Sequence, residues 1–379
     1  MISKAASNYM AFIGEWFKNE AKTIQQLMVY FYPSEKAIEL YETKTKKVFL
    51  HKTRIEEISQ SDFFIGAKLL IFGKQIVIVD YGDYNTKMKY GSEQRTFVMI
   101  FSEALQHLGE ILQAINKTGL HIRQLKMLKS DDNYSWILKN FRSENSELCY
   151  FIDNIPSNSF VAMELTGENS YTRFKALCGH ANTADEANVS APACLRALYG
   201  SGVYCPSSAS ASDMESKFVF SNNDVRLCLK ASVLFKNSTL CIIKPHAVRQ
   251  GLTGEIVSQI LQKGFIISAM KMLRIERPNC EEFLDVYKGV IPEFESMVMQ
   301  MISGDLIALE ITNKFENDCR TQQSFRDFCG PSCPEIARIT RPHTLRAQFG
   351  QNKILNAIYC TDLEEDTNLE LEYIFKFLP

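Results

Sequence analysis

The sequence lacks long hydrophobic runs and lacks an excess of charge of either sign. No stretch reaches the roughly 18 consecutive apolar residues that indicate a transmembrane helix. Residues 1–16, MISKAASNYMAFIGEW, lack the continuous apolar core of a secretory signal. The formal net charge is −2, so charge alone indicates neither nucleic acid nor an anionic membrane as a partner. We therefore expect a cytoplasmic protein without nucleic-acid or membrane partners.

The chain also lacks paired cysteine motifs. Its 11 cysteines are scattered through 379 residues, and the simplest interpretation is that they are reduced thiols. Cys329 and Cys333 form a CxxxC, but no second Cys or His pair lies at zinc-binding spacing. We interpret both as structural thiols, with a metal site as the alternative, and predict no metal.

Two parts of the sequence repeat one another in order. In each copy a strand-like run precedes a Gly-Glu, an amphipathic helix and a second, alternating strand. The paired segments are TFVMIFSEAL and TLCIIKPHAV, GEILQAINKTG and GEIVSQILQKG, LHIRQLKML and FIISAMKML, FVAMEL and LIALEI, KALCG and RDFCG, LRALYG and LRAQFG, and finally Tyr204-Cys205 and Tyr359-Cys360. Two copies of one α/β domain therefore span roughly 93–222 and 236–379. The stretch 212–238 completes the first copy and links it to the second, and YCPSSASASD at 204–213 is expected to be a loop.

The first 92 residues follow a different pattern. LMVYFYPSEKAIELYE and IGAKLLIFGKQIVIVDYGD each alternate around a turn, the second around Gly-Lys, which predicts a small antiparallel sheet. The basic run TKTKKVFLHKTR at 43–54 is either a solvated hairpin or a surface for an acidic partner such as tubulin. The predicted domains are thus 1–92, 93–235 and 236–379.

Two stretches of the second copy resemble nucleoside diphosphate kinases. TLCIIKPHAVRQGLTGEIVSQILQKGFIISAMKML resembles the opening of these enzymes, and LRAQFG followed by NAIYCTD resembles their catalytic end. The match spans nearly all of 236–379 and covers 93–222 weakly. DFFIGAKLLIFGKQIVIVDYGD resembles a DM10 domain, and a DM10 domain followed by two kinase-like domains resembles one subfamily of these kinases.

The resemblance implies an α+β fold. A small, pleckstrin-homology-like antiparallel β domain (DM10) would precede two tandem ferredoxin-like βαββαβ domains. It also implies residence in the cytoskeleton of cilia and flagella, as a microtubule inner protein of axonemal doublets. The implied partners are tubulin and other microtubule inner proteins.

The resemblance also assigns roles to residues of the second copy. In the family a histidine takes the γ-phosphoryl group from a nucleoside triphosphate and passes it to a diphosphate. The positions that match its nucleotide-binding groups are Lys244, Arg326, Ser332, Arg346 and Asn356, and Glu370 matches the residue that orients the nucleophile. The residue expected to stack on the base is Leu284, with Phe294 as the alternative.

Tyr359 stands at the position of the catalytic histidine. A phenol has a pKa of about 10, so little phenolate exists at pH 7, although the nearby cations would act to lower that pKa. The product would be an aryl phosphate ester, a far poorer phosphoryl donor than phosphohistidine. None of the six histidines in the chain occupies the nucleophile position.

The first copy departs further from the family pattern. Tyr204 occupies its nucleophile position, Phe101 replaces the lysine, and Lys175 replaces one arginine, while Arg196 remains. Only eight residues separate Arg196 from Tyr204, against thirteen between the equivalent residues of the second copy. We therefore expect neither catalysis nor nucleotide binding in this copy.

Three functions remain compatible with the sequence. The first is a structural, catalytically degenerate protein of axonemal doublets that requires no cofactor. The second is residual kinase or autophosphorylation activity through Tyr359. The third is binding of ATP or GTP, with magnesium, by the C-terminal copy without turnover. We predict the first, a pseudoenzyme, and retain nucleotide binding or residual activity as the alternative.

Overall fold

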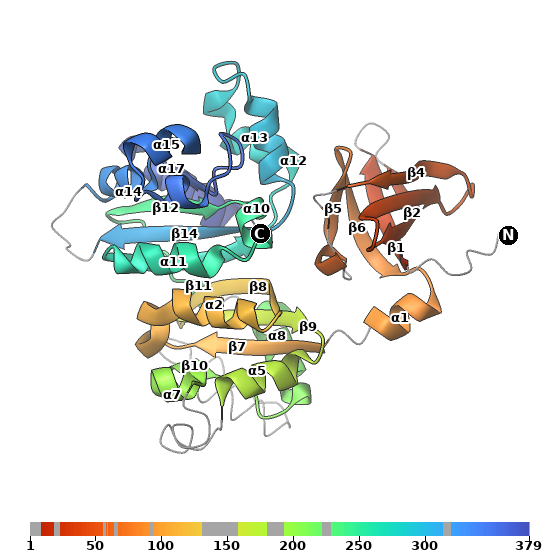
Figure 1. Cartoon of the computed structure of the whole chain (residues 1–379), viewed down its shortest axis with the longest axis horizontal. Coiled ribbons are helices and arrows are strands. Elements are labelled where there is room, and N and C mark those ends of the chain that lie inside the picture. The colour runs from red at the N-terminus through yellow and green to blue at the C-terminus, as the bar shows by residue number, and fades with distance from the viewer. Residues whose placement is uncertain are drawn as a thin grey trace. The chain divides into compact units, whose positions relative to one another are not determined.

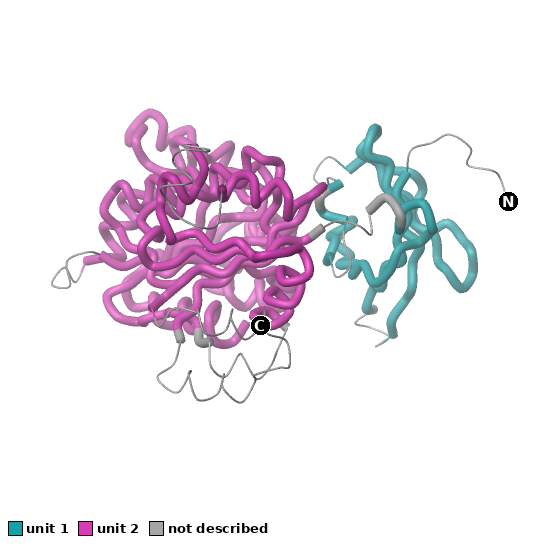
Figure 2. Tube along the Cα trace, turned by 90° about the horizontal axis from the view of Figure 1, so that it is seen from below, with its two compact units in different colours: residues 1–93 teal, residues 94–379 magenta. Residues whose placement is uncertain are grey.

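The computed structural model describes residues 9–18, 23–55, 58, 60–63, 67–90, 94–130, 158–179, 193–221, 229–313 and 320–378. The chain forms two compact units, residues 1–93 and residues 94–379 (Figure 2). Within the described ranges, no helix has the length and apolar content needed to cross a bilayer.

The first unit is a six-stranded antiparallel sheet in the order β4-β3-β2-β1-β6-β5. Its elements are β1 (Met10–Lys18), β2 (Thr23–Tyr32), β3 (Ala37–Glu42), β4 (Val48–Arg54), β5 (Lys68–Ile71), β6 (Lys74–Tyr81) and α1 (Tyr84–Tyr90). The predicted antiparallel sheet is confirmed, whereas its assignment as a DM10 or pleckstrin-homology-like domain stays a prediction. The tight turn before β6 is Phe72–Gly73 rather than Gly-Lys, because these two residues adopt the positive φ angles that such a hairpin needs.

The second unit contains one large antiparallel sheet built from both copies (Figure 1). The first copy contributes β7 (Gln94–Ile100), α2 (Leu108–Lys117), β8 (His121–Ser130), β9 (Phe160–Gly167), α5 (Ser170–Cys178) and β10 (Val203–Tyr204). The second contributes β12 (Ser238–Ile243), α11 (Thr253–Gln262), β13 (Phe265–Leu273), β14 (Leu306–Asn313), α14 (Thr321–Cys329) and β15 (Ile358–Cys360). The strand order β10-β7-β9-β8-β13-β14-β12-β15 places the same four-strand pattern twice, in mirrored sequence. The predicted βαββαβ core is therefore confirmed in both copies.

The two copies join edge to edge and helix to helix. Strand β8 pairs with β13 at Lys126 and Lys271, and α2 lies beside α11 (Figure 1). Each helix begins with a glycine that touches the other: a Cβ on Gly109 would lie 2.3 Å from the backbone N of Ser258, and one on Gly254 would lie 2.6 Å from the backbone N of Gln113. The Gly-Glu repeated in the sequence thus allows close approach of the two helices.

Both faces of this sheet are covered. Along β7, Val98 and Ile100 join the core cluster beneath α2 and α5, while Phe97 packs its ring against Phe220 of α8 (Ala209–Ser221) on the opposite face. Burial on both faces explains why these strands are nearly continuous apolar runs. The remaining elements of the unit are α7 (Leu195–Tyr199), β11 (Leu229–Ala231), α10 (Pro245–Arg249), α12 (Arg277–Phe283), α13 (Phe294–Met301), α15 (Pro334–Thr340), α16 (Leu345–Phe349) and α17 (Thr367–Glu372).

The loop predicted at 204–213 is shorter than expected. Tyr204 ends β10, and α8 already begins at Ala209. The side chain of Ser208 accepts a hydrogen bond from the backbone N–H of Ala211 at 3.0 Å, as a helix N-cap does. The serine-rich sequence was therefore misread as a loop because serine is common both in loops and at helix starts.

Candidate functional site

A cavity of about 580 Å³ opens in the second copy, and it collects most of the predicted site residues. Its wall includes Tyr359 together with all five predicted nucleotide-binding residues: Lys244, Arg326, Ser332, Arg346 and Asn356. These residues come from the ends of β12 and β15, from α14 and α16, and from the loops beside them. The fold therefore brings together residues that are more than 100 positions apart in the sequence.

Lys244 is placed by the end of β12 and the start of α10. Pro245 at the first helical position favours this start, because its fixed φ and missing N–H suit the first turn. The side chain of Lys244 is 5% exposed, and its Nζ donates to the carbonyl oxygen of Ile354 at 3.2 Å. Burial, reinforced by the positive charge of Arg346, lowers the pKa of Lys244 to about 7. An anion in the cavity would reverse this effect.

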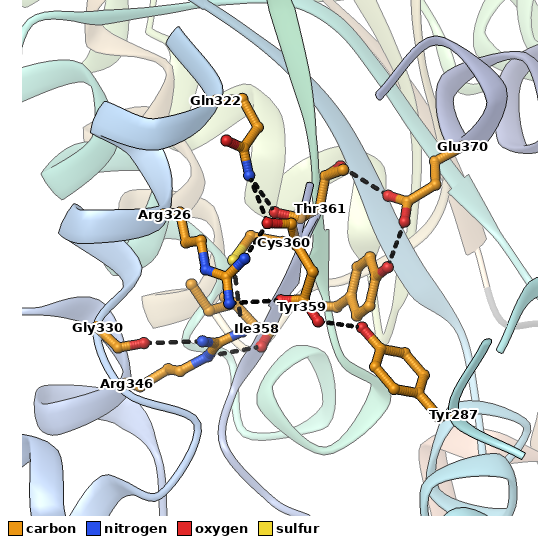
Figure 3. A network of polar contacts seen from close by, with 11 residues as sticks. Tyr287, Gln322, Arg326, Gly330, Arg346, Ile358, Tyr359, Cys360, Thr361 and Glu370 are labelled. Atoms are coloured by element: carbon orange, nitrogen blue, oxygen red, sulfur yellow. Dashed lines mark hydrogen bonds and ion pairs between the residues drawn. The ribbon is translucent and has the colours of Figure 1, made fainter. Parts of the chain in front are cut away.

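Both arginines of the cavity already have acceptors within the protein (Figure 3). Arg346 donates through Nη1 to the carbonyl oxygen of Gly330 at 2.8 Å and through Nε to that of Ile358 at 3.4 Å. Arg326 donates to the carbonyl oxygen of Asp362 and forms an ion pair with its carboxylate at 3.3 Å. A phosphate would therefore share or displace these partners.

Asn356 carries a buried acceptor that no other described side chain or backbone group satisfies. Its Nδ2 donates to the carbonyl oxygen of Ser332 at 2.9 Å, which fixes the amide orientation. Its Oδ1 finds no donor in the part of the chain that the structure describes. A buried acceptor without a partner is costly, so this position suits a hydroxyl donor of a bound ligand or a water molecule.

Tyr359 is held by Glu370 at the back of the cavity (Figure 3). Its hydroxyl donates to Oε1 of Glu370 at 2.5 Å, while Thr361 donates to Oε2 at 2.6 Å. Phe283 packs against the phenol ring with centroids 5.3 Å apart. Glu370, predicted to orient the nucleophile, does contact it, and α17 positions that carboxylate.

The electrostatics of this pair disfavour a phenolate. Burial raises the pKa of Tyr359 well above its ordinary value, and the negative charge of Glu370 and the neighbouring Tyr287 raise it further. The expectation that the cavity cations would lower this pKa is therefore wrong, because desolvation and the adjacent carboxylate dominate. Burial also raises the pKa of Glu370 to about 7.

His246 does not replace the missing nucleophile. Its Nε2 accepts from the backbone N–H of Ala357 at 3.2 Å, and its Nδ1 lies 2.8 Å from the side-chain amide nitrogen of Gln300. Burial and the nearby Lys244 lower the pKa of His246 to about 4, so the ring is neutral at pH 7. Both ring nitrogens are engaged in holding the loop before β15.

The first copy keeps the framework of the site but changes its charge. The hydroxyl of Tyr204 donates to Glu215 at 2.8 Å, and the ring of Phe101 lies 6.4 Å away. Arg196 donates to the carbonyl oxygen of Gly179 at 3.1 Å, as its counterpart in the second copy does to the equivalent glycine. Glu215 was not predicted, although it follows Tyr204 by the eleven residues that separate Glu370 from its tyrosine.

Other site residues were misassigned or missed. Leu284 is 1% exposed, and neither it nor Phe294 belongs to the cavity wall, where Ile291 and Met297 supply apolar surface instead. Asp362 was missed, although its carboxylate also accepts from Tyr287 at 2.6 Å. No group of three or more His, Cys, Asp or Glu in the described ranges could hold a metal ion.

The fold and the cavity define a nucleotide-kinase-like protein, and the family model described as nucleoside diphosphate kinase matches residues 94–225 and 237–378. The chain belongs to the nucleoside diphosphate kinase family. It is 37% identical over 388 residues to nucleoside diphosphate kinase homolog 7 of Mus musculus, with 100% of this chain and 95% of that protein covered. The homolog of the same name in Rattus norvegicus is 38% identical over 387 residues, covering 99% of this chain and 95% of that protein.

These full-length matches confirm the subfamily that the domain order resembles, that of nucleoside diphosphate kinase homolog 7. A crystal form of the Aquifex aeolicus nucleoside diphosphate kinase is 34% identical, covers 37% of this chain and 95% of its own, and has a TM-score of 0.34.

Proposed function

We propose that this protein is a catalytically silent member of its family that serves as a structural component of ciliary and flagellar doublet microtubules. The observation that supports silence is the tyrosine-glutamate pair in both copies: Tyr204 with Glu215, and Tyr359 with Glu370. Each phenol occupies the nucleophile position, and each hydroxyl proton is committed to a carboxylate. An enzyme that loses one copy can rely on the other, but this chain has the same substitution twice.

The chemistry of the pair also supports this proposal. Glu370 is positioned to accept a proton from Tyr359, so attack on a γ-phosphate is not blocked by geometry alone. The product would nevertheless be an aryl phosphate ester, which does not return the group readily to a diphosphate. At most, one phosphoryl group would be trapped on Tyr359.

The doublet-microtubule part of the proposal is supported by the domain order and by the surface of the first unit. Tubulin and other microtubule inner proteins are the proposed partners. The basic run at 43–54 exposes Lys44, Lys46, Lys47 and Arg54 on and before β4. Exposed cations of one sign favour association with an acidic surface.

The test uses the full chain and salt-washed doublet microtubules from cilia. We expect the chain to bind whether or not magnesium-ATP is present, and we expect Lys44→Glu with Lys46→Glu to weaken binding, most strongly at low salt. A matched control, Lys217→Glu with Lys376→Glu in the second unit, should leave binding unchanged. Binding to undecorated membranes or nucleic acid instead of doublets would contradict the proposal.

A second candidate function is nucleotide binding without turnover, and the cavity of the C-terminal copy favours it. Lys244 and Arg346 supply buried positive charge, and Oδ1 of Asn356 awaits a donor. We propose that a nucleoside di- or triphosphate, with any magnesium carried by its phosphates, occupies this cavity. Equilibrium dialysis with labelled ADP tests this, with Asn356→Ala expected to weaken binding and Asn352→Ala, outside the cavity wall, expected not to.

A further inference from the structure

Four of the eight described cysteines form two pairs at equivalent places in the two copies. Cys178 ends α5 and Cys329 ends α14, while Cys205 and Cys360 directly follow the two site tyrosines. The thiols of Cys178 and Cys205 hydrogen-bond to each other, and so do those of Cys329 and Cys360. All four are reduced in the structure.

The pairs lie inside the shared hydrophobic core rather than on the surface. Cys178, Cys329 and Cys360 belong to the core cluster, and Cys205 packs against it. The Sγ of Cys178 lies 3.9 Å from the carbonyl oxygen of Val203, which fixes the end of α5 against β10. In both copies the fold therefore sets a helix end directly against the strand end that follows the nucleophile position.

An arginine accompanies each pair. Arg346 points Nη2 at the Sγ of Cys360, 3.5 Å away. Arg196, its counterpart in the first copy, likewise favours an anionic sulfur at Cys178. The hydrogen bond from Cys329, helped by the charge of Arg346, lowers the pKa of Cys360 to about 6. A cation beside a cysteine promotes the thiolate, which is the reactive form.

The second pair is also open to small molecules, because Cys360 belongs to the wall of the cavity of about 580 Å³. Cys329 is not part of that wall. One sulfur of the pair is thus accessible through the cavity, and its partner waits behind it. This division between an accessible and a shielded thiol matches an attacking and a resolving cysteine.

We propose that Cys329–Cys360 and Cys178–Cys205 are thiol–disulfide pairs that a hydroperoxide oxidises to two intramolecular disulfides. In the second copy the thiolate of Cys360 attacks the terminal oxygen of hydrogen peroxide, the O–O bond breaks, and hydroxide leaves as water after taking a proton. The resulting sulfenic acid is attacked by the sulfur of Cys329, whose proton leaves with the sulfenic oxygen as a second water. Two thiols and one peroxide therefore give one disulfide and two waters.

The disulfide would connect the end of α14 to β15. These elements carry Arg326 and Tyr359, so the oxidised form would hold two walls of the cavity at a fixed separation. The proposal does not depend on nucleotide binding, since it concerns only the thiols. A cross-link between segments distant in sequence also restrains the unfolded chain, so oxidation should raise the thermal midpoint of the second unit.

The test maps disulfides in the full chain. Reduced protein is treated with hydrogen peroxide, quenched with iodoacetamide, digested without reductant and analysed by mass spectrometry. We expect peptides joined through Cys329–Cys360 and Cys178–Cys205, both lost after dithiothreitol. Peptides joined through Cys241–Cys360, which face each other across β12 and β15, would overturn the assignment. Full alkylation of all four thiols after peroxide would overturn it as well.

Variants separate the roles of the two thiols. In Cys329→Ser, dimedone should label Cys360 as a trapped sulfenic acid, whereas in Cys360→Ser it should leave Cys329 unlabelled. Cys280→Ser is the matched control, because Cys280 is also buried but bonds to the carbonyl oxygen of Val298 instead of a thiol. It should leave both disulfide yields unchanged, and dimedone labelling of Cys329 in Cys360→Ser would refute the proposed order of attack.

Discussion

Lys244 should couple anion binding to proton uptake. Its folded-state pKa of about 7 lies far below the ordinary 10.5, which corresponds to about 5 kcal/mol against the charged form. Between these two pH values the unfolded chain binds more protons than the folded protein. The free energy of unfolding should therefore rise with pH through this window, and the destabilisation is fully present below pH 7.

A phosphate group reverses this balance because it supplies the negative charge that burial withholds. At pH 8 only about a tenth of free Lys244 is protonated, so an anion that restores the ordinary pKa takes up about 0.9 proton. The affinity for ADP should then fall by up to about tenfold for each pH unit between 7 and 10. The nucleotide itself is fully ionised above pH 8 and does not obscure the effect.

Isothermal titration calorimetry with ADP at pH 8, in buffers of different ionisation enthalpy, measures this uptake directly. Lys244→Met should abolish the uptake, and Lys353→Met should preserve it, because Lys353 pairs at the exposed rim with Glu293 at 2.8 Å. Proton release, or uptake that survives Lys244→Met, would refute the reasoning.

Three further predictions concern the framework of the second unit. Tyr359→Phe leaves Oε1 of Glu370 without its donor, so the urea-derived free energy of unfolding should fall by about 1–3 kcal/mol at pH 8, and by less at pH 5, where Glu370 (pKa about 7) is protonated. Gly109→Val should cost about 2–3 kcal/mol, because its Cβ would meet the backbone of Ser258 at 2.3 Å; unchanged thermal stability would contradict the close helix contact. Glu310 accepts both linker N–H groups just before β12, at 2.8 Å each, so Glu310→Ala should speed proteolysis at 232–237, and unchanged cleavage would show that the linker has another anchor.

The sequence was sufficient for the repeat and for much of the local structure. The run FIISAMKML coincides with β13, and Gly264 has the positive φ expected of a residue that ends a helix. Both predictions rest on short-range patterns. The joining of β8 to β13 rests on contacts between distant segments, and no periodicity within one copy indicates which sheet edge pairs with the other.

The candidate site was predictable only in its membership. Family spacing placed Lys244, Arg346 and Asn356 together, because the motif positions carry that information. The raised pKa of Tyr359 was not predictable, since it depends on burial and on the orientation of Glu370. The cysteine pairs were visible as repeated letters, but their contact became evident only once the helix ends and strand ends were placed.

The central claim is that the second copy keeps a phosphate cavity and lacks its nucleophile. The most direct test measures γ-phosphate transfer from ATP to a nucleoside diphosphate by the full chain, beside Tyr359→His and Tyr359→Phe prepared in the same way. The native chain should match Tyr359→Phe at background, while Tyr359→His should transfer phosphate, because Lys244, Arg346 and Glu370 already surround the position. Transfer by the native chain well above the Tyr359→Phe background would contradict the account.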